Sequence, residues 1–371
     1  MDGLKDLSEP IVVYIGTYTR RESFVNGRGE GIYAYALDPG SGALAYLSTV
    51  PGAVNPSFLT VAPQQGCLYA VNEITGEHGR HGTVSAYAID PVSGDLTYLN
   101  AQSTHGLAPC FVSLDGTGRY ALVANYETGS VCVLPIEEDG RLGEATDVVQ
   151  HHGSGPHPRQ AGPHAHMITP GPDGRTIFAV DLGTDRILAY HLDLERGRLG
   201  AADPPWVQLS PGTGPRHLAF HPDGRFAYVI SELRSTVTVF GYDNGWGTLR
   251  ERQTISTLPE GFAGDNLGAE ICVAPSGRYV YASNRGHDSI AVYAVDAETG
   301  ELSLLGHQPS QGVGPRYFTI DPTGTFLLVA NQDSDSVVTF RIDQGSGELT
   351  ATGHVTEVPT PVCLQLLQPS E

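Results

Sequence analysis

The sequence predicts an all-β protein, a seven-bladed β-propeller with four antiparallel strands in each blade. A hairpin made of an apolar strand, a tight turn and a second apolar strand occurs six times along the 371 residues. An alternating strand that ends in an acidic residue occurs seven times, at intervals of 47–56 residues. Repeats of this length are typical of propellers and solenoids, and four short strands per repeat favour the propeller.

The first two strands of each blade are expected in the hairpins. One hairpin, residues 214–233, reads GPRHLAFHPDGRFAYVISEL, and its equivalents span residues 55–73, 108–126, 163–182, 268–285 and 314–332. The alternating third strands are expected at 31–38, 83–90, 130–137, 186–193, 236–243, 289–296 and 336–343. A Gly-containing turn and a leucine follow each of them and open a more polar fourth strand.

The two ends of the chain predict how the ring closes. Residues 11–17, IVVYIGT, resemble a second strand without a first, and residues 361–367, PVCLQLL, resemble a first strand without a second. Pairing the two would complete the seventh blade, so we expect a single propeller domain over 11–368 with loose tails at 1–10 and 369–371. The longest insertions, 20–30 and 150–162, are expected on the loop faces.

Composition limits the classes of partner. The net charge is −20, which disfavours nucleic acid and anionic membranes, and Lys5 is the only lysine, so a positive site must be built from arginine. Five scattered cysteines without a C-x-x-C pattern fit a reducing compartment. Because there is neither an apolar signal core nor a stretch of membrane-spanning length, we expect a cytoplasmic protein. We also expect it to be a monomer or a weak homo-oligomer.

Two registers of the repeat carry ionisable residues instead of uniform structural ones. The register of Arg216, in the first strand, is occupied in the other blades by Ser57, Cys110, His166, Ala269, Arg316 and either Val362 or Cys363. The register of Glu232, after the second strand, is occupied by Glu73, Tyr126, Leu182, Arg285, Gln332 and Thr17. Innermost strands present equivalent positions around one channel mouth, so these side chains are expected to converge there.

The expected cluster is His166, Arg216, Glu232 and Arg285, with Arg316 and Glu270 nearby. Ionisable groups in a concave, partly desolvated mouth suit acid–base chemistry on an anion, since arginine binds phosphate or carboxylate and imidazole takes a proton from water. The alternative interpretation is structural, with Arg216–Glu232 and Arg285–Glu270 as buried ion pairs.

Other candidate sites are weaker. Five histidines between 151 and 166 lie in Gly/Pro-rich loop without a metal-binding helix motif, so no metal site is expected. His164 and His166 alternate along one strand edge and are expected to share a face. Cys110 could be a nucleophile, but small buried cysteines are common. The sequence contains no G-x-S-x-G elbow, P-loop or dinucleotide fingerprint, which argues against a covalent serine mechanism and a nucleotide cofactor.

The chain resembles the seven-bladed propeller lactonases, typified by bacterial 6-phosphogluconolactonase and related to fungal carboxy-cis,cis-muconate lactonising enzyme. The motifs that carry the resemblance are GTYT (16–19), NPSFL (55–59), GPHAH (162–166), GPRHLAFHPDGRFAYV (214–229), STVTVF (235–240), SNRGHDSIAVY (283–293) and VANQDSDSV (329–337). The family's proposed site, a histidine, two arginines and a glutamate, maps onto His166, Arg216, Arg285 and Glu232.

The resemblance implies hydrolysis of a small anionic lactone, foremost 6-phospho-D-glucono-1,5-lactone in the oxidative pentose phosphate route, with no cofactor or metal. In this hypothesis Arg216 stabilises the oxyanion and His166 activates water, with Glu232 orienting the water or serving as the base. Arg285 holds the phosphate. The remaining substrate contacts are assigned to His164, Glu270, Arg316 (on the phosphate) and Glu73.

Two alternatives use the same cluster differently. A muconate-type cycloisomerase, or another lactonase, would act on a dicarboxylate or on a different lactone. A non-catalytic propeller would bind an anion through the arginines without turnover, and a scaffold of this kind should expose a large apolar or aromatic patch.

Overall fold

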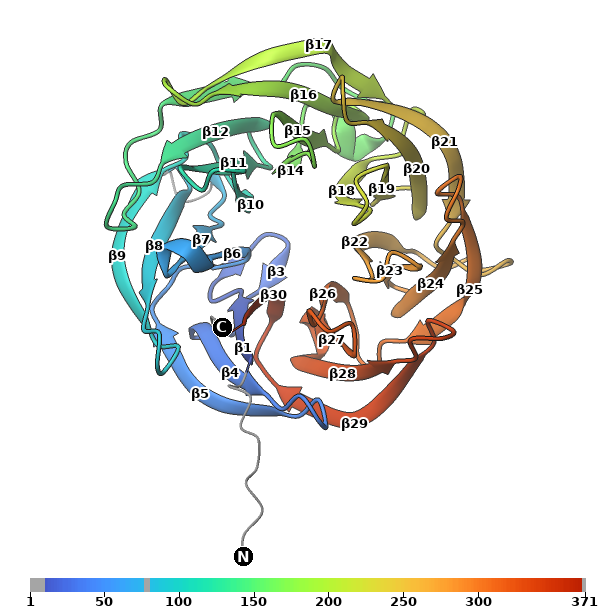
Figure 1. Ribbon diagram of the computed structural model, residues 1–371. Helices are drawn as coiled ribbons and strands as arrows, with labels where there is room; N and C mark the ends of the chain where they lie inside the picture. The colour runs from blue at the N-terminus through green and yellow to red at the C-terminus, as the bar shows by residue number, and fades with distance from the viewer. Residues whose placement is uncertain (1–10, 77–80, 369–371) are drawn as a thin grey trace, which may run out of the picture.

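Seven four-stranded antiparallel sheets surround a central axis in the computed structural model, which describes residues 11–76 and 81–368 (Figure 1). The predicted all-β fold and its seven blades of four strands are confirmed. The tails expected at 1–10 and 369–371 lie outside the described residues. Residues 12–76 and 81–366 of the described chain all belong to this ring or to the loops that join its strands.

Each blade runs from its innermost to its outermost strand in the order given. Blade 1 is β30 (Pro361–Leu367), β1 (Ile11–Thr17), β4 (Gly31–Leu37) and β5 (Leu44–Pro51), and blade 2 is β6 (Leu59–Ala62), β7 (Cys67–Asn72), β8 (Thr83–Ile89) and β9 (Leu96–Ser103). Blade 3 is β10 (Pro109–Leu114), β11 (Tyr120–Asn125), β12 (Ser130–Pro135) and β13 (Asp147–Gln150), and blade 4 is β14 (Ala165–Pro170), β15 (Thr176–Asp181), β16 (Arg186–Asp193) and β17 (Arg198–Gln208).

The last three blades follow the same plan. Blade 5 is β18 (Pro215–Phe220), β19 (Phe226–Ser231), β20 (Thr236–Asp243) and β21 (Thr248–Ser256). Blade 6 is β22 (Leu267–Val273), β23 (Tyr279–Arg285), β24 (Ser289–Val295) and β25 (Leu302–Pro309), and blade 7 is β26 (Pro315–Ile320), β27 (Phe326–Asn331), β28 (Ser336–Ile342) and β29 (Leu349–Glu357). The described helical segments are the 3₁₀ turns η1 (Pro63–Gln65), η3 (Pro158–Gln160) and η4 (Gln332–Ser334).

The ring closes through the pairing that the chain ends predict. β30 lies antiparallel to β1, with Leu364 opposite Ile15 and Leu366 opposite Val13, and β1 pairs with β4 on its other side. Figure 1 shows the last strand, in red, beside the first, in blue. Closure pairs strands that are more than 340 residues apart, so blade 1 forms only when both ends of the domain are in place.

Burial changes from the inner strands to the outer ones. Every residue of the second strands β7, β11, β15, β19 and β27 is buried, because each blade packs face to face between two others. The outermost strands alternate or are exposed, as in β17 and β29. Continuous apolar runs in the second strands and alternating runs in the fourth are the sequence signatures of these two environments.

A repeated hydrogen bond joins neighbouring blades. A tyrosine hydroxyl on one blade donates to a glycine carbonyl in the turn between the third and fourth strands of the next, in the pairs Tyr14–Gly94, Tyr69–Gly140, Tyr228–Gly300 and Tyr281–Gly347. At Gly347 the backbone has φ +77°, and a Cβ there would lie 2.4 Å from Tyr279. Glycine is therefore required both by the turn and by the approach of the blades.

The acidic residue that ends each third strand has a structural role in most blades. The Asp38 carboxylate accepts hydrogen bonds from the backbone N–H groups of Gly40 and Ser41, and Asp296 does the same for Glu298 and Thr299. These bonds lower the pKa of both carboxyl groups. The recurring acid is a turn residue, because a short carboxylate side chain mimics a backbone carbonyl.

The two long insertions form ordered structure beside the channel. Residues 20–30 contain a hairpin of β2 (Arg21–Glu22) and β3 (Val25–Asn26). Its buried Glu22 accepts hydrogen bonds from Asn55 Nδ2 and Thr75 Oγ1. Residues 150–162 contain η3, capped by the side chain of His157. Both insertions are fixed to the blades at one end of the channel.

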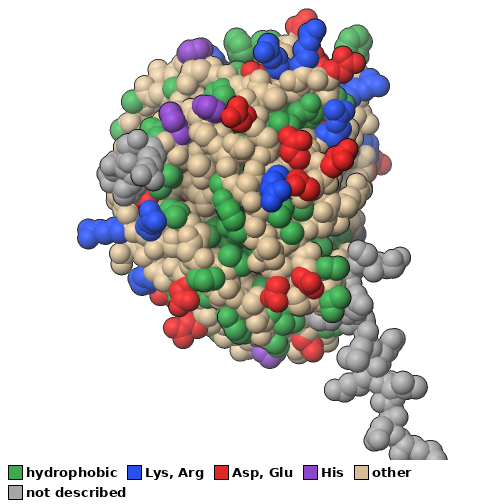
Figure 2. Space-filling view, turned by 90° about the vertical axis from the view of Figure 1, so that its left-hand side faces the viewer, with side chains coloured by type: hydrophobic (Ala, Val, Ile, Leu, Met, Phe, Trp, Pro, Cys, Tyr) green, Lys and Arg blue, Asp and Glu red, His purple; other side chains and the backbone are tan. Residues whose placement is uncertain are grey.

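The outer surface is mixed in character. Figure 2 shows the side on which β5 and β9 lie, where hydrophobic side chains occur in separate groups among charged and polar ones. Four of the exposed hydrophobic residues belong to blades 1 and 2, namely Tyr46, Leu47, Val92 and Tyr98. Within 11–76 and 81–368 no helix has the length and apolar character that crossing a membrane requires.

Closure of the ring can be tested with Leu364→Ala. Leu364 is fully buried in the cluster that joins β30 to blade 7, so the cavity left by truncation should lower the free energy of unfolding by about 2–5 kcal/mol. The control is Leu305→Ala on the outermost strand β25, where the side chain is 50% exposed and the expected change is within about 0.5 kcal/mol. Urea unfolding curves measure both, and equal midpoints would contradict the closure argument.

Candidate active site

A β-bulge recurs in the innermost strands and shapes the site. The ladder between first and second strands skips one residue at Cys110, His166, Arg216 and Arg316, and it is irregular between Gly268 and Ile271. A bulge turns the side chain of the unpaired residue away from its normal direction. The residues in the register of Arg216 are therefore presented at one end of the channel by their backbone geometry.

The second register is equally regular. The backbone N–H groups of Glu73, Tyr126, Leu182, Glu232 and Gln332 each donate to the carbonyl of the residue two positions before the bulge register in their own blade. Equivalent hydrogen bonds place these five side chains at the same height around the channel. These positions therefore differ in the chemical type of the side chain and not in the backbone that presents it.

The Glu232 carboxylate is the centre of a charged cluster. Its Oε2 lies 2.9 Å from Arg285 Nη2 and 3.1 Å from Arg216 Nε, and its Oε1 lies 2.6 Å from Arg159 Nη2. Burial by itself would raise the pKa of Glu232, but the arginines, Arg285 foremost, outweigh it and lower the pKa to about 2. Glu232 is ionised at neutral pH and makes a poor proton acceptor.

Arg216 is more deeply buried in the protein than Arg285. Arg216 is 3% exposed and its Nη1 donates to the carbonyl of Ala269 at 2.6 Å. Burial lowers the pKa of Arg285 to about 10, with Glu232 opposing that shift, and its Nη2 donates to Gly268. The buried Arg216–Glu232 pair of the structural interpretation is therefore present, and Arg285 pairs with the same carboxylate.

His166 supplies an uncharged ring to the same end of the channel. It is buried, and its ring meets Tyr126 edge-on at 5.6 Å and His217 at 5.0 Å between centroids. Burial, followed by the nearby Arg216, lowers the pKa of His166 well below its ordinary value. Its Nδ1 is buried without a hydrogen-bond partner among the described residues, so Nε2 is the nitrogen available to a ligand.

A second carboxylate, Glu73, lies in blade 2 in a different setting. Its Oε2 accepts hydrogen bonds from the hydroxyl groups of Tyr18 at 2.8 Å and Ser57 at 2.5 Å. Arg316 Nη2 donates to the Tyr18 hydroxyl at 3.0 Å. Burial raises the pKa of Glu73 despite the opposing effect of Arg316.

These groups surround a cavity of about 800 Å³. Its lining includes five residues of the two registers that have candidate roles in binding or catalysis, and one further arginine: Glu73, His166, Glu232, Arg285, Arg316 and Arg159. The exposed Phe24 and Val313 stand at its rim. A cavity of this size with a few convergent polar groups fits a small-molecule site.

Three residues predicted for the site lie outside the cavity lining. Arg216 is buried and contacts Glu232 through its Nε. His164 stacks on the Tyr126 ring at 4.6 Å, and its Nδ1 lies 2.9 Å from the Tyr126 carbonyl oxygen. The bulge at His166 interrupts the alternation of the strand next to His164, and only His166 lines the cavity.

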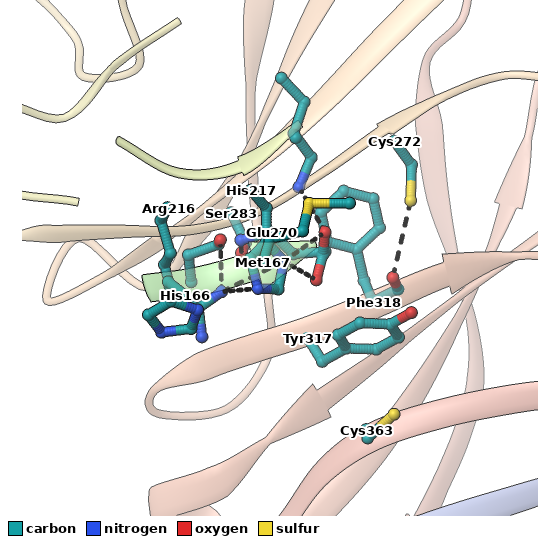
Figure 3. Close-up of polar contacts among 12 residues, drawn as sticks. His166, Met167, Arg216, His217, Glu270, Cys272, Ser283, Tyr317, Phe318 and Cys363 are labelled. Atoms are coloured by element: carbon teal, nitrogen blue, oxygen red, sulfur yellow. Dashed lines mark hydrogen bonds and ion pairs between the residues drawn. The ribbon is translucent and has the colours of Figure 1, made fainter. Parts of the chain in front are cut away.

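Glu270 also departs from expectation. Its carboxylate lies 2.9 Å from Nδ1 of His217 (Figure 3). The Arg285–Glu270 pair of the structural interpretation is not formed, because Arg285 pairs with Glu232. His217 and Glu270 occupy the positions just below the bulge, where His217 meets the Phe111 ring edge-on at 5.2 Å. This pair and its aromatic neighbours form the floor of the site, away from the mouth.

Sequence reasoning missed two contributors. Arg159 comes from the 150–162 insertion, and Tyr18 follows β1 in the GTYT motif. Neither belongs to the two registers, so the repeat could not identify them. The signals available were that Arg159 is the single arginine of the longest insertion and that Tyr18 directly follows Thr17 in the second register.

Cys110 lines the cavity as an uncharged thiol. Burial and the neighbouring Glu73 raise the pKa of the thiol far above its ordinary value. Its Sγ lies 3.5 Å from the carbonyl oxygen of His166. A nucleophilic cysteine requires a thiolate, so this environment favours the structural interpretation of Cys110.

Comparison with known proteins extends over the whole ring. Residues 12–366 match the family model described as "Lactonase, 7-bladed beta-propeller". A Bacillus subtilis protein named 6-phosphogluconolactonase is 39% identical over 308 residues, which cover 83% of this chain and 84% of that one. The solved structure of a periplasmic gluconolactonase from Pseudomonas aeruginosa is 39% identical with a TM-score of 0.91, covering 97% of this chain and 99% of that one.

The charge cluster predicts that Glu232→Gln lowers the free energy of unfolding by an amount that depends on pH. Three arginines would lose their shared carboxylate, so the free energy of unfolding at pH 7 should fall by about 3 kcal/mol. Because folding lowers the pKa of Glu232, its stabilisation is complete above the unfolded value near 4.5 and is lost as the pH falls toward about 2.

Urea unfolding of wild type and variant at pH 7, 5.5 and 4 measures this difference. It should be constant at the two higher values and smaller at pH 4. Glu127→Gln, which removes an exposed carboxylate from the same cavity, is the control. A difference that stays constant down to pH 4, or that Glu127→Gln reproduces, would refute the assignment.

Proposed function

The chain belongs to the seven-bladed β-propeller lactonase family, and we propose that it hydrolyses a sugar lactone, with 6-phospho-D-glucono-1,5-lactone as the lead substrate. One observation carries the proposal. The cavity combines a neutral imidazole, His166, with a guanidinium, Arg316, that forms no ion pair with a described residue. Hydrolysis of a lactone needs a proton acceptor for water and a donor for the oxyanion.

His166 is the proposed base. An imidazole whose pKa is lowered is unprotonated at neutral pH and can accept a proton from water through Nε2. Glu232 is less suited to this step, because its pKa of about 2 makes the carboxylate a weaker acceptor. In the proposal Glu232 instead holds Arg159, Arg216 and Arg285 in place.

Arg316 is the proposed oxyanion donor. Its one hydrogen bond to a described residue goes to Tyr18, which leaves other guanidinium N–H groups for the cavity. The sequence assigned this role to Arg216, but Arg216 lies below the cavity lining and already donates to Ala269. Arg216 therefore acts on the site through Glu232 and through the electrostatic field at His166.

Arg159 and Arg285 are the proposed phosphate contacts. Both line the cavity, and the side chains are 40% and 16% exposed. Arg159 Nη2 also donates to the Tyr126 hydroxyl at 2.9 Å, which fixes the guanidinium at the edge of the site. Two arginines fixed side by side can bind a phosphate through several charge-assisted hydrogen bonds.

An unphosphorylated sugar lactone is the second candidate. Besides Glu73, whose pKa is raised, five acidic side chains line the cavity with three arginines: Glu127, Glu232, Asp265, Asp288 and Asp333. This excess of negative charge disfavours a phosphate dianion and is neutral toward a sugar. The Pseudomonas relative, named a gluconolactonase, supports the same candidate.

We infer a cytoplasmic location for the phosphorylated substrate and its enzyme. The five cysteines are all unpaired, which suits a reducing compartment. Fractionation of the source cells tests this inference, and recovery of the protein in the periplasm, the location named for the Pseudomonas relative, would overturn it.

Lactone turnover by the purified protein tests the function. We expect the chelator-treated protein to open 6-phosphogluconolactone, freshly made by glucose-6-phosphate dehydrogenase, well above the spontaneous rate. Unphosphorylated gluconolactone is the matched comparison, and preference for it would select the second candidate. Turnover of neither would contradict lactone hydrolysis and favour a muconate-type substrate or anion binding without turnover.

The base can be tested with His166→Gln, which keeps a polar side chain but cannot accept the proton. We expect kcat/KM to fall by about 10²–10⁴. In wild type kcat/KM should stay level through pH 6.5 and fall only at lower pH, because His166 must be neutral and its pKa is lowered. The control is His191→Gln, an exposed histidine on the outer part of blade 4. A wild-type acid limb that begins above pH 6.5, so that kcat/KM is already falling when the pH is lowered to 6.5, would contradict the role of His166.

A further inference from the structure

We propose that Glu73 is the proton donor to the ring oxygen as the lactone opens. The proposal rests on lactone hydrolysis as proposed above and adds a catalytic residue to it. Lactone opening expels an alkoxide, which is a poor leaving group unless it is protonated as the bond breaks. His166 and Arg316 account for the attack on the carbonyl, so the departure of the ring oxygen requires a further group.

The Glu73 carboxyl group is held in one orientation. Oε2 accepts from the Tyr18 and Ser57 hydroxyl groups, whereas Oε1 has no hydrogen bond to any described residue. Glu73 lines the cavity, so Oε1 is the oxygen available to a ligand there. A proton on Oε1 would face the substrate while Oε2 stays hydrogen bonded.

The position next to Arg316 suits the ring oxygen. Tyr18 joins the two groups, since its hydroxyl accepts from Arg316 and donates to Glu73. In a lactone the carbonyl oxygen and the ring oxygen are bonded to the same carbon. A group that protonates the ring oxygen must therefore lie beside the group that stabilises the oxyanion, and Glu73 is the cavity carboxyl so linked to Arg316.

The two register carboxylates have opposite surroundings. Glu232 contacts three arginines, whereas Glu73 contacts two hydroxyl groups and forms no ion pair with a described residue. The charged or titratable groups around Glu73 are Tyr18, Cys110, Arg216 and Arg316. Burial outweighs them and raises the pKa of Glu73, as the neutral form of a proton donor requires. The two carboxyl groups therefore suit different roles, Glu73 as a proton donor and Glu232 as the counter-charge of the arginines.

The step balances without a co-reactant. Water adds to the carbonyl carbon, the carbonyl electrons move to the oxygen beside Arg316, and the water proton goes to His166 Nε2. The carbonyl then re-forms, the bond from carbon to the ring oxygen breaks, and the ring oxygen takes the proton from Glu73 Oε1. The product is a hydroxy acid that ionises, and both side chains return to their starting states by exchange with solvent.

Glu73→Gln, assayed on two lactones, tests the proposal. With the sugar lactone, which expels an alkoxide, kcat should fall about 100-fold. Dihydrocoumarin expels a phenolate, whose pKa, like that of tyrosine, is about 10, so it needs little protonation and its kcat should change at most a few-fold. Glu195→Gln is the control, an exposed carboxylate in the turn between β16 and β17 and outside the cavity lining, whose loss should leave both rates unchanged. A merely structural role for Glu73 would lower both rates alike.

The pH dependence of kcat with the sugar lactone is a second measurement, which does not require dihydrocoumarin to be accepted. In wild type kcat should decline on the alkaline side as Glu73 loses its proton, and Glu73→Gln should abolish that decline. Ser57→Ala removes a hydroxyl that stabilises the ionised carboxylate, so it should move the alkaline decline to higher pH.

The failures of the two proposals are distinguishable. If wild type opens no lactone, the proposed function fails and the role of Glu73 fails with it. If wild type is active but Glu73→Gln loses equal activity on both lactones, or keeps both its rate and the alkaline decline, the role of Glu73 alone is overturned.

Discussion

The ion cluster around Glu232 is the interaction on which the site depends. Guanidinium groups repel one another, and in a buried setting they can be brought together only around a counter-charge. Glu232 supplies it to Arg216 from its own blade, to Arg285 from the next blade and to Arg159 from an insertion. One carboxylate therefore lets a chain with a net charge of −20 present positive groups at the channel mouth.

The repeat explains why such a cluster can form without disturbing the fold. The bulge and the backbone hydrogen bond after the second strand recur in most blades, whatever side chain occupies the register. Stability comes from the buried second strands and from the Tyr–Gly bonds between blades. The side chain at the bulge can therefore differ from blade to blade while the packing of the second strands stays constant, as expected when functional residues are carried by a rigid scaffold.

The environment decides what each register residue can do. Glu73 and Glu232 share backbone geometry, yet burial raises the pKa of Glu73, whereas the arginines around Glu232 lower the pKa of that carboxyl group. Arg316 and Arg216 likewise share the bulge position, but Arg216 is committed to Glu232 and Ala269 whereas Arg316 keeps donors for a ligand. The position of a residue in the repeat does not by itself define a catalytic role, because its hydrogen-bond and ion-pair partners determine whether the side chain is charged and whether it can contact a ligand.

The sequence by itself determined the seven blades, the closure of the ring through its two ends and the two registers that carry the ionisable residues. These follow from local periodicity and turn residues, and the same pattern occurs in each repeat. Only the tertiary structure decided the partners. Glu270 pairs with His217 instead of Arg285, His164 stacks on Tyr126 outside the cavity lining, and Arg159 joins from an insertion. Such contacts depend on the direction in which each bulge aims its side chain and on loop conformation, and neither is encoded in the spacing of residues along the chain.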